Sequence, residues 1–315
     1  MKVFVTGGTG YLGGAIARAF KTAGHQVSVL CRQAVQVSSL ARQGMQGVIG
    51  DMTTAGDWLK AVAEAEIIIH AAHLRPGMRL SSSWLKQSGE ARDRCLHLLF
   101  DTAKRAGNCQ LFIYTSGMVA HGDHGERVVD ENTPSLPSQM GNYHLEGERL
   151  TQEAFRSGLP TTVIRAGFTY GPDGSFGKFF LAEAEKGRYR FPGNGRNYLS
   201  FVHINDLARA YLLAAEKRPI GQIISVVDNE PMSLLRMAEI MLAEISPKGG
   251  KAIAMPSWLV ALFAGSPLAE MLTSSVRVKN AKARLLLGWE PKYASVADGM
   301  RDVVRNYLAL KAAKA

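Results

Sequence analysis

The 315-residue sequence contains only three cysteines, Cys31, Cys95 and Cys109, and no C-x-x-C pair. Such widely spaced cysteines exclude a disulfide framework and a cysteine-based zinc site. No apolar run approaches the ~18 residues that a membrane-spanning helix needs. The first residues, MKVFVTGGTG, lack the apolar core of a signal peptide. The composition therefore predicts a soluble protein of the cytoplasm without a transmembrane segment.

Clustered positive charge is also missing. The net charge is +10, from 37 basic and 27 acidic residues, but the basic residues are scattered and form no run of five. Nucleic-acid-binding proteins concentrate such charge on a stripe or in a motif. Nucleic acid is therefore not an expected partner, whereas a phosphate-rich or anionic small ligand accounts for part of the charge. His121 and His124 lack a third or fourth ligand, so no metal is expected.

Short β-type runs alternate with longer helical stretches in the first half of the chain. The runs are KVFVTG, QVSVLC, GVIGD, IIIHAA, LFIYTS and TTVIRA, and QIISVV follows later. This alternation predicts an α/β fold, a Rossmann-type doubly wound parallel sheet. Gly/Pro-rich loops beyond Arg165 predict a smaller C-terminal substrate lobe. The expected domains are 1–167 plus about 201–227, and about 168–200 plus 228–315.

One run in the second half is conspicuously apolar. Residues 258–265 read WLVALFAG, which is too short to cross a membrane. We interpret it as a core helix of the smaller lobe. The alternatives are a lid over an apolar substrate and a surface contact with a membrane.

A glycine-rich turn follows the first strand. In VFVTGGTGYLGG, Gly7, Gly10 and Gly13 are spaced three apart between a β run and a helix. The first glycine permits a tight turn, the second lets the backbone approach a pyrophosphate, and the third lets helix and strand pack closely. The pattern predicts binding of a dinucleotide.

The end of the second strand bears on the choice of nicotinamide cofactor. An acidic residue there binds the ribose 2′-hydroxyl and repels a 2′-phosphate. This strand ends in Cys31 and Arg32, without a carboxylate nearby. Because a guanidinium forms charge-assisted hydrogen bonds with phosphate, Arg32 favours NADP, with NAD as the less favoured alternative.

Several motifs together resemble the extended short-chain dehydrogenases/reductases, the NAD(P)-dependent epimerase/dehydratase superfamily. They are TGGTGYLG, GDMTT, IIIHAAH, VIRAGFTYGPDG, FVHINDLARA and ARLLLGWEPKYASVADGMRDVV. The resemblance implies that Asp51 contacts the adenine, and that the segment with Ala71 and Ala72 lines the cofactor. The implied cofactor positions are Gly7, Thr9, Gly10, Tyr11, Leu12, Gly13, Arg32, Asp51, Met52, Ala71, Ala72, His144 and Ala166.

The family's catalytic set is incomplete in this sequence. Its members use a serine or threonine, a tyrosine, and a lysine four residues later that lowers the tyrosine's pKa. In FIYTSGMVAHG, Gly117 stands at the hydroxyl position, with Thr115 and Ser116 just upstream. The resemblance therefore leaves Thr115 and Ser116 as candidate hydroxyl groups.

Two alignments of the catalytic helix QMGNYHLEGERL are open. The first keeps Tyr143 as the tyrosine and places Gly147 at the lysine position. The second aligns Glu148 with the family's glutamate, which places Met140 at the tyrosine position and His144 at the lysine position. We prefer the second, in which Tyr143 still projects from nearly the same face about one turn on.

The resemblance places the substrate between the sheet and the smaller lobe. The candidate substrate residues are His73, Gly117, Met140, Phe168, Tyr170 and Arg196. Arg188, Arg190 and Arg196 favour a sugar nucleotide, whereas RLSSSWLKQ and PSWLVALFAG favour a bulky apolar molecule. Both alternatives stay open.

Two functions are consistent with these residues. The first is an NADP-dependent oxidoreductase or isomerase that acts on a hydroxyl or carbonyl of a small molecule, with Tyr143, Ser116, His144 and Thr115 as candidate catalytic groups. The alternative is a redox-inactive protein that binds or senses NADP and engages a partner. The family also implies a homodimer through the helix that carries Tyr143.

Overall fold

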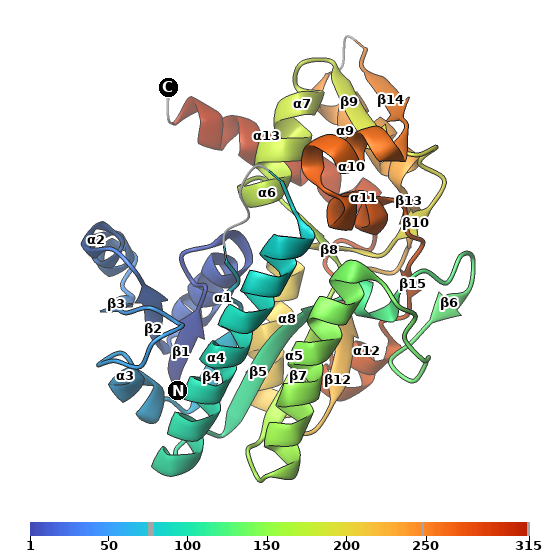
Figure 1. The fold of residues 1–315 in the computed structure, drawn as a ribbon. Helices are drawn as coiled ribbons and strands as arrows, with labels where there is room; N and C mark the ends of the chain where they lie inside the picture. Colours follow the sequence, from blue (N-terminus) through green and yellow to red (C-terminus); the bar gives the residue numbers. More distant parts are fainter. Residues whose placement is uncertain (75–78, 247–248, 314–315) are drawn as a thin grey trace.

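A seven-stranded parallel sheet forms the centre of the computed structural model, which describes residues 1–74, 79–246 and 249–313 (Figure 1). The order is β12-β7-β5-β4-β1-β2-β3, so the strand order reverses beside β1 and the predicted doubly wound fold is confirmed. The strands are β1 (Lys2–Thr6), β2 (Gln26–Cys31), β3 (Gln46–Ile49), β4 (Ile67–His70), β5 (Leu111–Gly117), β7 (Thr161–Ala166) and β12 (Ile223–Val226).

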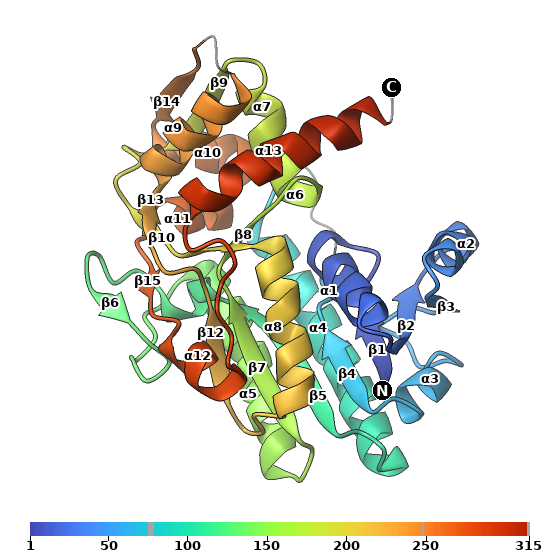
Figure 2. The same ribbon diagram turned by 180° about the vertical axis from the view of Figure 1, so that it is seen from behind.

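Helices cover both faces of this sheet, which is why β4 and β7 are buried along their whole length. One face carries α3, α4 and α5, and the other carries α1 and α8 (Figures 1 and 2). The main-domain helices are α1 (Tyr11–Thr22), α2 (Ala34–Arg42), α3 (Leu59–Ala63), α4 (Ser82–Ala106), α5 (Gln139–Arg156) and α8 (Ile204–Lys217).

The smaller lobe has its own apolar core above the C-terminal edge of the sheet (Figure 1). Its strands are β8 (Phe168–Tyr170), β9 (Arg188–Pro192), β10 (Tyr198–Leu199), β11 (Phe201–His203), β13 (Met232–Ser233) and β14 (Lys251–Met255). Its helices are α6 (Gly174–Phe176), η2 (Gly177–Leu181), α7 (Ala182–Ala184), α9 (Leu234–Ile245), α10 (Ser257–Ala264), α11 (Ser266–Thr273) and α13 (Val296–Ala312). Three short elements lie between, η1 (Met118–His121), β6 (Val128–Val129) and β15 (Arg277–Val278).

Two later segments return to the main sheet, as expected. β12 pairs with β7 in parallel, and α8 packs against α1. The helix α12 (Ala281–Leu287) also packs on this face, and the indole of Trp289 donates a hydrogen bond to the Asp206 carbonyl. The segment 281–289 therefore packs with the main domain, although it lies within the stretch predicted for the smaller lobe. The domain boundaries stay a prediction.

The apolar run 258–265 is not a core helix, and that expectation is wrong. It forms α10, in which no side chain is buried. Its apolar residues lie all around the helix, so packing on α11 leaves part of them in contact with solvent. In the described segments, no helix combines the length and the apolarity needed to span a bilayer.

A buried ion pair holds α5 on the sheet. Arg165 of β7 donates to both carboxylate oxygens of Glu148, at 2.9 and 2.7 Å, and Ser116 of β5 donates at 2.5 Å. Glu148 and Arg165 are 3% and 4% exposed, so neither charge has water as an alternative partner. Since Glu148 can meet these partners from only one helix face, the pair fixes the rotation of α5 about its axis.

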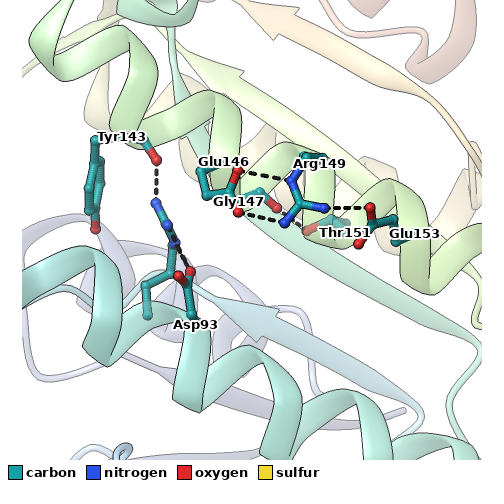
Figure 3. A network of polar contacts seen from close by, with 8 residues as sticks. Asp93, Tyr143, Glu146, Gly147, Arg149, Thr151 and Glu153 are labelled. Atoms are coloured by element: carbon teal, nitrogen blue, oxygen red, sulfur yellow. Dashed lines mark hydrogen bonds and ion pairs between the residues drawn. The ribbon is translucent and has the colours of Figure 1, made fainter. Parts of the chain in front are cut away.

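We expect Glu148→Gln to lower the free energy of unfolding by about 3–5 kcal/mol, because it leaves the Arg165 charge buried without a counter-charge. Glu146→Gln is the matched control on the exposed side of α5, where Glu146 and Glu153 pair with Arg149 (Figure 3). Glu146→Gln should lower the free energy of unfolding by no more than about 1 kcal/mol. Urea unfolding measures both. Arg165→Met added to Glu148→Gln should restore part of the loss, and equal effects of the two glutamine variants would contradict the assignment.

Candidate active site

The glycine-rich turn connects β1 to α1 at the C-terminal edge of the sheet. Gly7 has a φ of +74°, and a Cβ there would lie 2.5 Å from the Ala71 carbonyl oxygen. A Cβ on Gly13 would lie 2.3 Å from the Gly7 carbonyl oxygen. Both positions therefore require glycine. The turn has the close strand-to-helix packing of a nucleotide-binding turn.

The first turn of α1 can receive an anionic group. Its N-cap, Gly10, supplies no side-chain hydrogen bond, and Thr9 and Gly10 are exposed. Tyr11 and Leu12 follow in this turn, and their side chains are partly buried. The backbone N–H groups of the turn are therefore the donors that a ligand can reach. Such groups and the helix dipole stabilise phosphate charge. This geometry fits the pyrophosphate of a dinucleotide.

Arg32 and Asp51 follow two neighbouring strands. β2 and β3 pair in parallel up to Cys31 and Ile49, so the residues after them lie at the same edge. Hydrogen bonds from Thr53, at 2.5 and 2.7 Å, lower the pKa of Asp51, and the nearby Arg32 charge lowers it further. Asp51 is therefore ionised at neutral pH, and both side chains are exposed.

The other predicted cofactor positions line the same edge. Ala71 and Ala72 follow β4 beside Gly7, Ala166 ends β7, and Met52 follows β3. Met52, Ala71 and Ala72 are partly exposed, whereas Ala166 is buried. The fold thus brings the predicted positions together, and their contacts with a cofactor stay a prediction.

His144 points from α5 toward the end of β5. A Cβ on Gly117 would lie 3.3 Å from Nε2 of His144, so the imidazole lies against the position that lacks a hydroxyl. Met140 lies one turn before His144 and Glu148 one turn after it, on the same helix face. Met140, His144 and Glu148 are the residues that the second alignment assigns to family positions, and that alignment stays a prediction.

Tyr143 points from α5 toward α4 (Figure 3). Its hydroxyl lies 3.4 Å from Oγ of Ser88, and the Arg92 guanidinium lies 4.7 Å from the centre of its ring. Arg92 also donates a hydrogen bond to the Tyr143 carbonyl. Burial raises the pKa of Tyr143, although Ser88 and Arg92 oppose that shift. A phenol in this environment stays protonated at neutral pH.

The hydroxyls of Thr115 and Ser116 already have protein partners. Ser116 donates to the buried Glu148, and Oγ1 of Thr115 accepts a hydrogen bond from Tyr211 at 2.8 Å. A catalytic role would require either hydroxyl to exchange its partner for a substrate. The roles of both residues stay predictions.

His144 does not supply the positive charge of the family's lysine. Burial lowers the pKa of His144 to about 3, and the charges of Arg92, His73 and Arg165 act in the same direction. Its Nδ1 is buried and has no hydrogen-bond partner among the residues that the structure describes. The ring is therefore neutral at neutral pH and offers one donor and one acceptor.

Aromatic contacts connect His73 to His144. The ring centres are 6.3 Å apart from His73 to Trp84, 6.4 Å from Trp84 to Tyr143 and 5.1 Å from Tyr143 to His144. His73 is the exposed end of this chain of rings. The structure thus links both predicted histidines through one aromatic cluster.

Met140 lines a cavity between α5 and α11. The lining residues are Val119, Gly122, Ser138, Met140, Glu270, Met271, Ser274 and Val276. Lysine and arginine are absent from this lining, and Glu270 is held by hydrogen bonds from Gln139. The cavity therefore combines apolar side chains with one carboxylate.

The remaining predicted substrate residues do not line this cavity. Phe168 packs against Phe180 and Phe201, and Tyr170 is buried with its hydroxyl donating to the Ser295 carbonyl. Arg196 is exposed between β9 and β10. Contacts of these residues with a substrate stay predictions.

Three residues of α4 around Tyr143 were not predicted from the sequence. Trp84, Ser88 and Arg92 are spaced four apart and therefore share a helix face, which was the available signal. Nothing in the sequence indicated that this face would contact Tyr143, more than 50 residues later.

Comparison with known proteins shows the family and the fold. Residues 3–226 match the model of the NAD dependent epimerase/dehydratase family. A 3-diazoavenalumate denitrifying reductase from a Streptomyces species is 28% identical, and the alignment covers 95% of this chain and 99% of that protein.

Two solved structures share the fold. The human epimerase family protein SDR39U1 with NADPH has a TM-score of 0.80 and 19% identity, covering 97% of this chain and 100% of the other. The Bacillus cereus UDP-glucuronic acid 4-epimerase in complex with UDP-glucuronic acid and NAD has a TM-score of 0.79 and 22% identity, covering 99% and 100%. At this identity the likeness shows the fold alone.

Gly147 gives a test of the rotation of α5. A Cβ there would lie 2.0 Å from the Tyr114 hydroxyl and 3.0 Å from Cδ of Arg92. Gly147→Ala should therefore lower the free energy of unfolding by at least about 2 kcal/mol, although alanine is the better helix former.

The matched control is Gly89→Ala on α4, where the added Cβ would have its nearest neighbours at 3.7 and 4.0 Å. This variant should be as stable as the wild type or more stable, by up to about 1 kcal/mol. Thermal and urea unfolding measure both. An equally stable Gly147→Ala would mean that α5 is rotated differently.

Proposed function

The chain belongs to the NAD dependent epimerase/dehydratase family, and from this premise we propose that it binds NADP(H) and oxidises or reduces a hydroxyl or carbonyl of a small apolar molecule. The observation that carries the proposal is the Nε2 of His144 beside Gly117. The preferred alignment assigns these two residues to the family's lysine and hydroxyl positions, and on that alignment a side chain capable of hydrogen bonding would remain where the family's chemistry takes place.

The cofactor assignment rests on the turn after β1 and on the charge after β2. The turn formed by Gly7 and Gly13 would hold the pyrophosphate at the first turn of α1. Arg32 would bind the 2′-phosphate, and Asp51 would accept hydrogen bonds from the adenine. When bound, the nicotinamide supplies or accepts the hydride.

His144 acts on the substrate oxygen. Its Nε2–H donates a hydrogen bond to the carbonyl oxygen and stabilises the charge that develops there during reduction. Because burial lowers its pKa to about 3, the imidazole acts as a neutral donor, and water supplies the proton of the product hydroxyl. Neutral imidazoles with lowered pKa values polarise carbonyl groups in other enzymes.

We favour a substrate class from the residues around Met140. Val119, Met140, Met271 and Val276 offer apolar contacts, and the Glu270 carboxylate repels an anion such as a diphosphate. The cavity that they line, about 10 Å³, holds no more than about one water molecule. The apolar character of this surface, rather than the fit of a molecule in the cavity, favours an apolar carbonyl compound over a sugar nucleotide. The name of the Streptomyces relative, a denitrifying reductase, is in line with a reduction but does not bear on the substrate class.

We expect His144→Ala to lower kcat for reduction of an apolar ketone by about 100-fold or more, measured as consumption of NADPH. Tyr143→Phe, which keeps the ring in the α4–α5 interface, should lower it less than about tenfold. Affinity for NADPH should stay within about threefold in both variants. A larger loss in Tyr143→Phe would assign the proton transfer to Tyr143. Tight NADPH binding with no turnover across apolar ketones and UDP-sugars would support the cofactor-sensing alternative.

The pH dependence gives a second test of His144. Burial lowers the pKa of His144 in the folded protein to about 3. The neutral imidazole, which is the active form, therefore persists above about pH 4 and is lost only as the pH falls toward 3. The kcat/KM should therefore be flat between about pH 5 and 8. A decline with a midpoint near the usual histidine pKa of ~6.5 would contradict a buried neutral imidazole.

Arg32→Ala should weaken NADPH binding by about tenfold or more and leave NADH binding unchanged, because only NADPH carries the 2′-phosphate. Arg42→Ala, an exposed arginine on α2, is the control and should change neither affinity. Titration calorimetry measures both cofactors. Equal losses for the two cofactors would show that Arg32 does not recognise the 2′-phosphate.

A further inference from the structure

The helix α10 presents an apolar face that no described part of the chain covers. Trp258, Leu262 and Phe263 are 67%, 55% and 70% exposed. Helical spacing places these three on one arc together with Leu259. This arc, Trp258–Leu259–Leu262–Phe263, is the apolar face of α10.

The other side of α10 faces the site described above. It packs on α11, which carries the cavity residues Glu270 and Met271. The α10 carbonyls of Ala261 and Ala264 accept hydrogen bonds from Arg79 and from the backbone of Leu80, just before α4. The apolar face therefore lies one helix away from the cavity beside Met140.

The strand pair that leads into α10 carries exposed basic residues. β14 pairs in parallel with β9, so Lys251 lies opposite Arg188 at the end farther from α10, and Met255 lies opposite Pro192 at the nearer end. The nearest acidic residue of the neighbouring helix α11 is Glu270, which accepts hydrogen bonds from Gln139. Residues 186–205 and 249–269 contain no aspartate or glutamate. Their basic residues are Lys186, Arg188, Arg190, Arg196 and Lys251.

Most of this charge is not neutralised by the protein. Lys186 and Arg190 share the single carboxylate of Glu183. Among the described residues, Arg188, Arg196 and Lys251 have no carboxylate within ion-pair distance, and all three are exposed. An exposed tryptophan with other apolar side chains, on the same lobe as unpaired cations, is a composition that binds the interface of an anionic bilayer.

We propose that α10 docks the smaller lobe on a membrane surface rich in anionic lipid. Trp258, Leu262 and Phe263 enter the interfacial region, and Arg188, Arg190 and Lys251 meet the headgroups. The charge of this region favours lipid over a second copy of the chain, because two such lobes would repel each other. The proposal does not depend on the redox chemistry, since it rests on α10, β9 and β14.

Flotation of the full chain with vesicles tests the proposal. Vesicles of phosphatidylcholine with phosphatidylglycerol should bind the protein at least about tenfold more tightly than phosphatidylcholine alone, and added salt should weaken the binding. Trp258 should report the contact by a blue shift of its fluorescence, because Trp58 and Trp289 are already buried and Trp84 is partly buried.

The triple variant Trp258→Ser, Leu262→Ser, Phe263→Ser should lose this binding by about tenfold or more and unfold at an unchanged temperature, since none of the three side chains is buried. Leu285→Ser, which changes an 82% exposed leucine on α12, is the matched control and should bind like the wild type. Arg188→Glu with Lys251→Glu should weaken binding to anionic vesicles only.

Three results would overturn the proposal. The first is no binding to anionic vesicles, and the second is binding that the triple variant leaves unchanged. The third is a dimer in sedimentation that the triple variant dissociates while vesicles bind neither protein, which would assign the apolar face to a second copy.

Discussion

The buried pair of Glu148 and Arg165 is the interaction on which the site depends. A carboxylate without water must meet its partners directly, and here they are Arg165 on β7 and Ser116 on β5. This requirement sets the rotation of α5. His144 and Met140, one and two turns before Glu148, then face the end of the sheet and the cavity, whereas Tyr143 faces α4. Gly147 lies against Tyr114 of β5 and Arg92 of α4.

The rotation of α5 also determines which charged groups lie near the site. The preferred alignment assigns His144 to the lysine position of the family, and His144 carries a neutral imidazole. A cation is still present close by, because Arg92 of α4 contacts the ring and the carbonyl of Tyr143. Arg92 disfavours protonation of His144, so the cation in the α4–α5 interface helps to keep the imidazole neutral. The proposed chemistry therefore relies on hydrogen bonding rather than on a charged donor.

The fold shows where the basic residues that give the net charge of +10 lie. Arg32 and Arg94 both act on Asp51 at the adenosine side of the proposed cofactor site. In the smaller lobe, the basic residues on or next to β9 and β14 are Lys186, Arg188, Arg190, Arg196 and Lys251. These residues are far apart in the sequence and form no run. Only the parallel pairing of β9 with β14 brings Arg188 and Lys251 together, which is why the sequence suggested scattered charge.

The sequence by itself determined the fold class, the main strands along the chain and the glycine-rich turn, because these follow from local alternation and from steric limits that act within a few residues. Its resemblance to the family also offered Glu148 as the point on which the second alignment of the catalytic helix depends. The apolar run of α10 shows where it failed, since an apolar helix of this length fits a core and a surface equally well. Only the tertiary structure decided that α10 is exposed, that Tyr143 faces α4 and that His144 faces Gly117. These outcomes depend on contacts between residues far apart in the chain, and local physical chemistry does not specify such contacts.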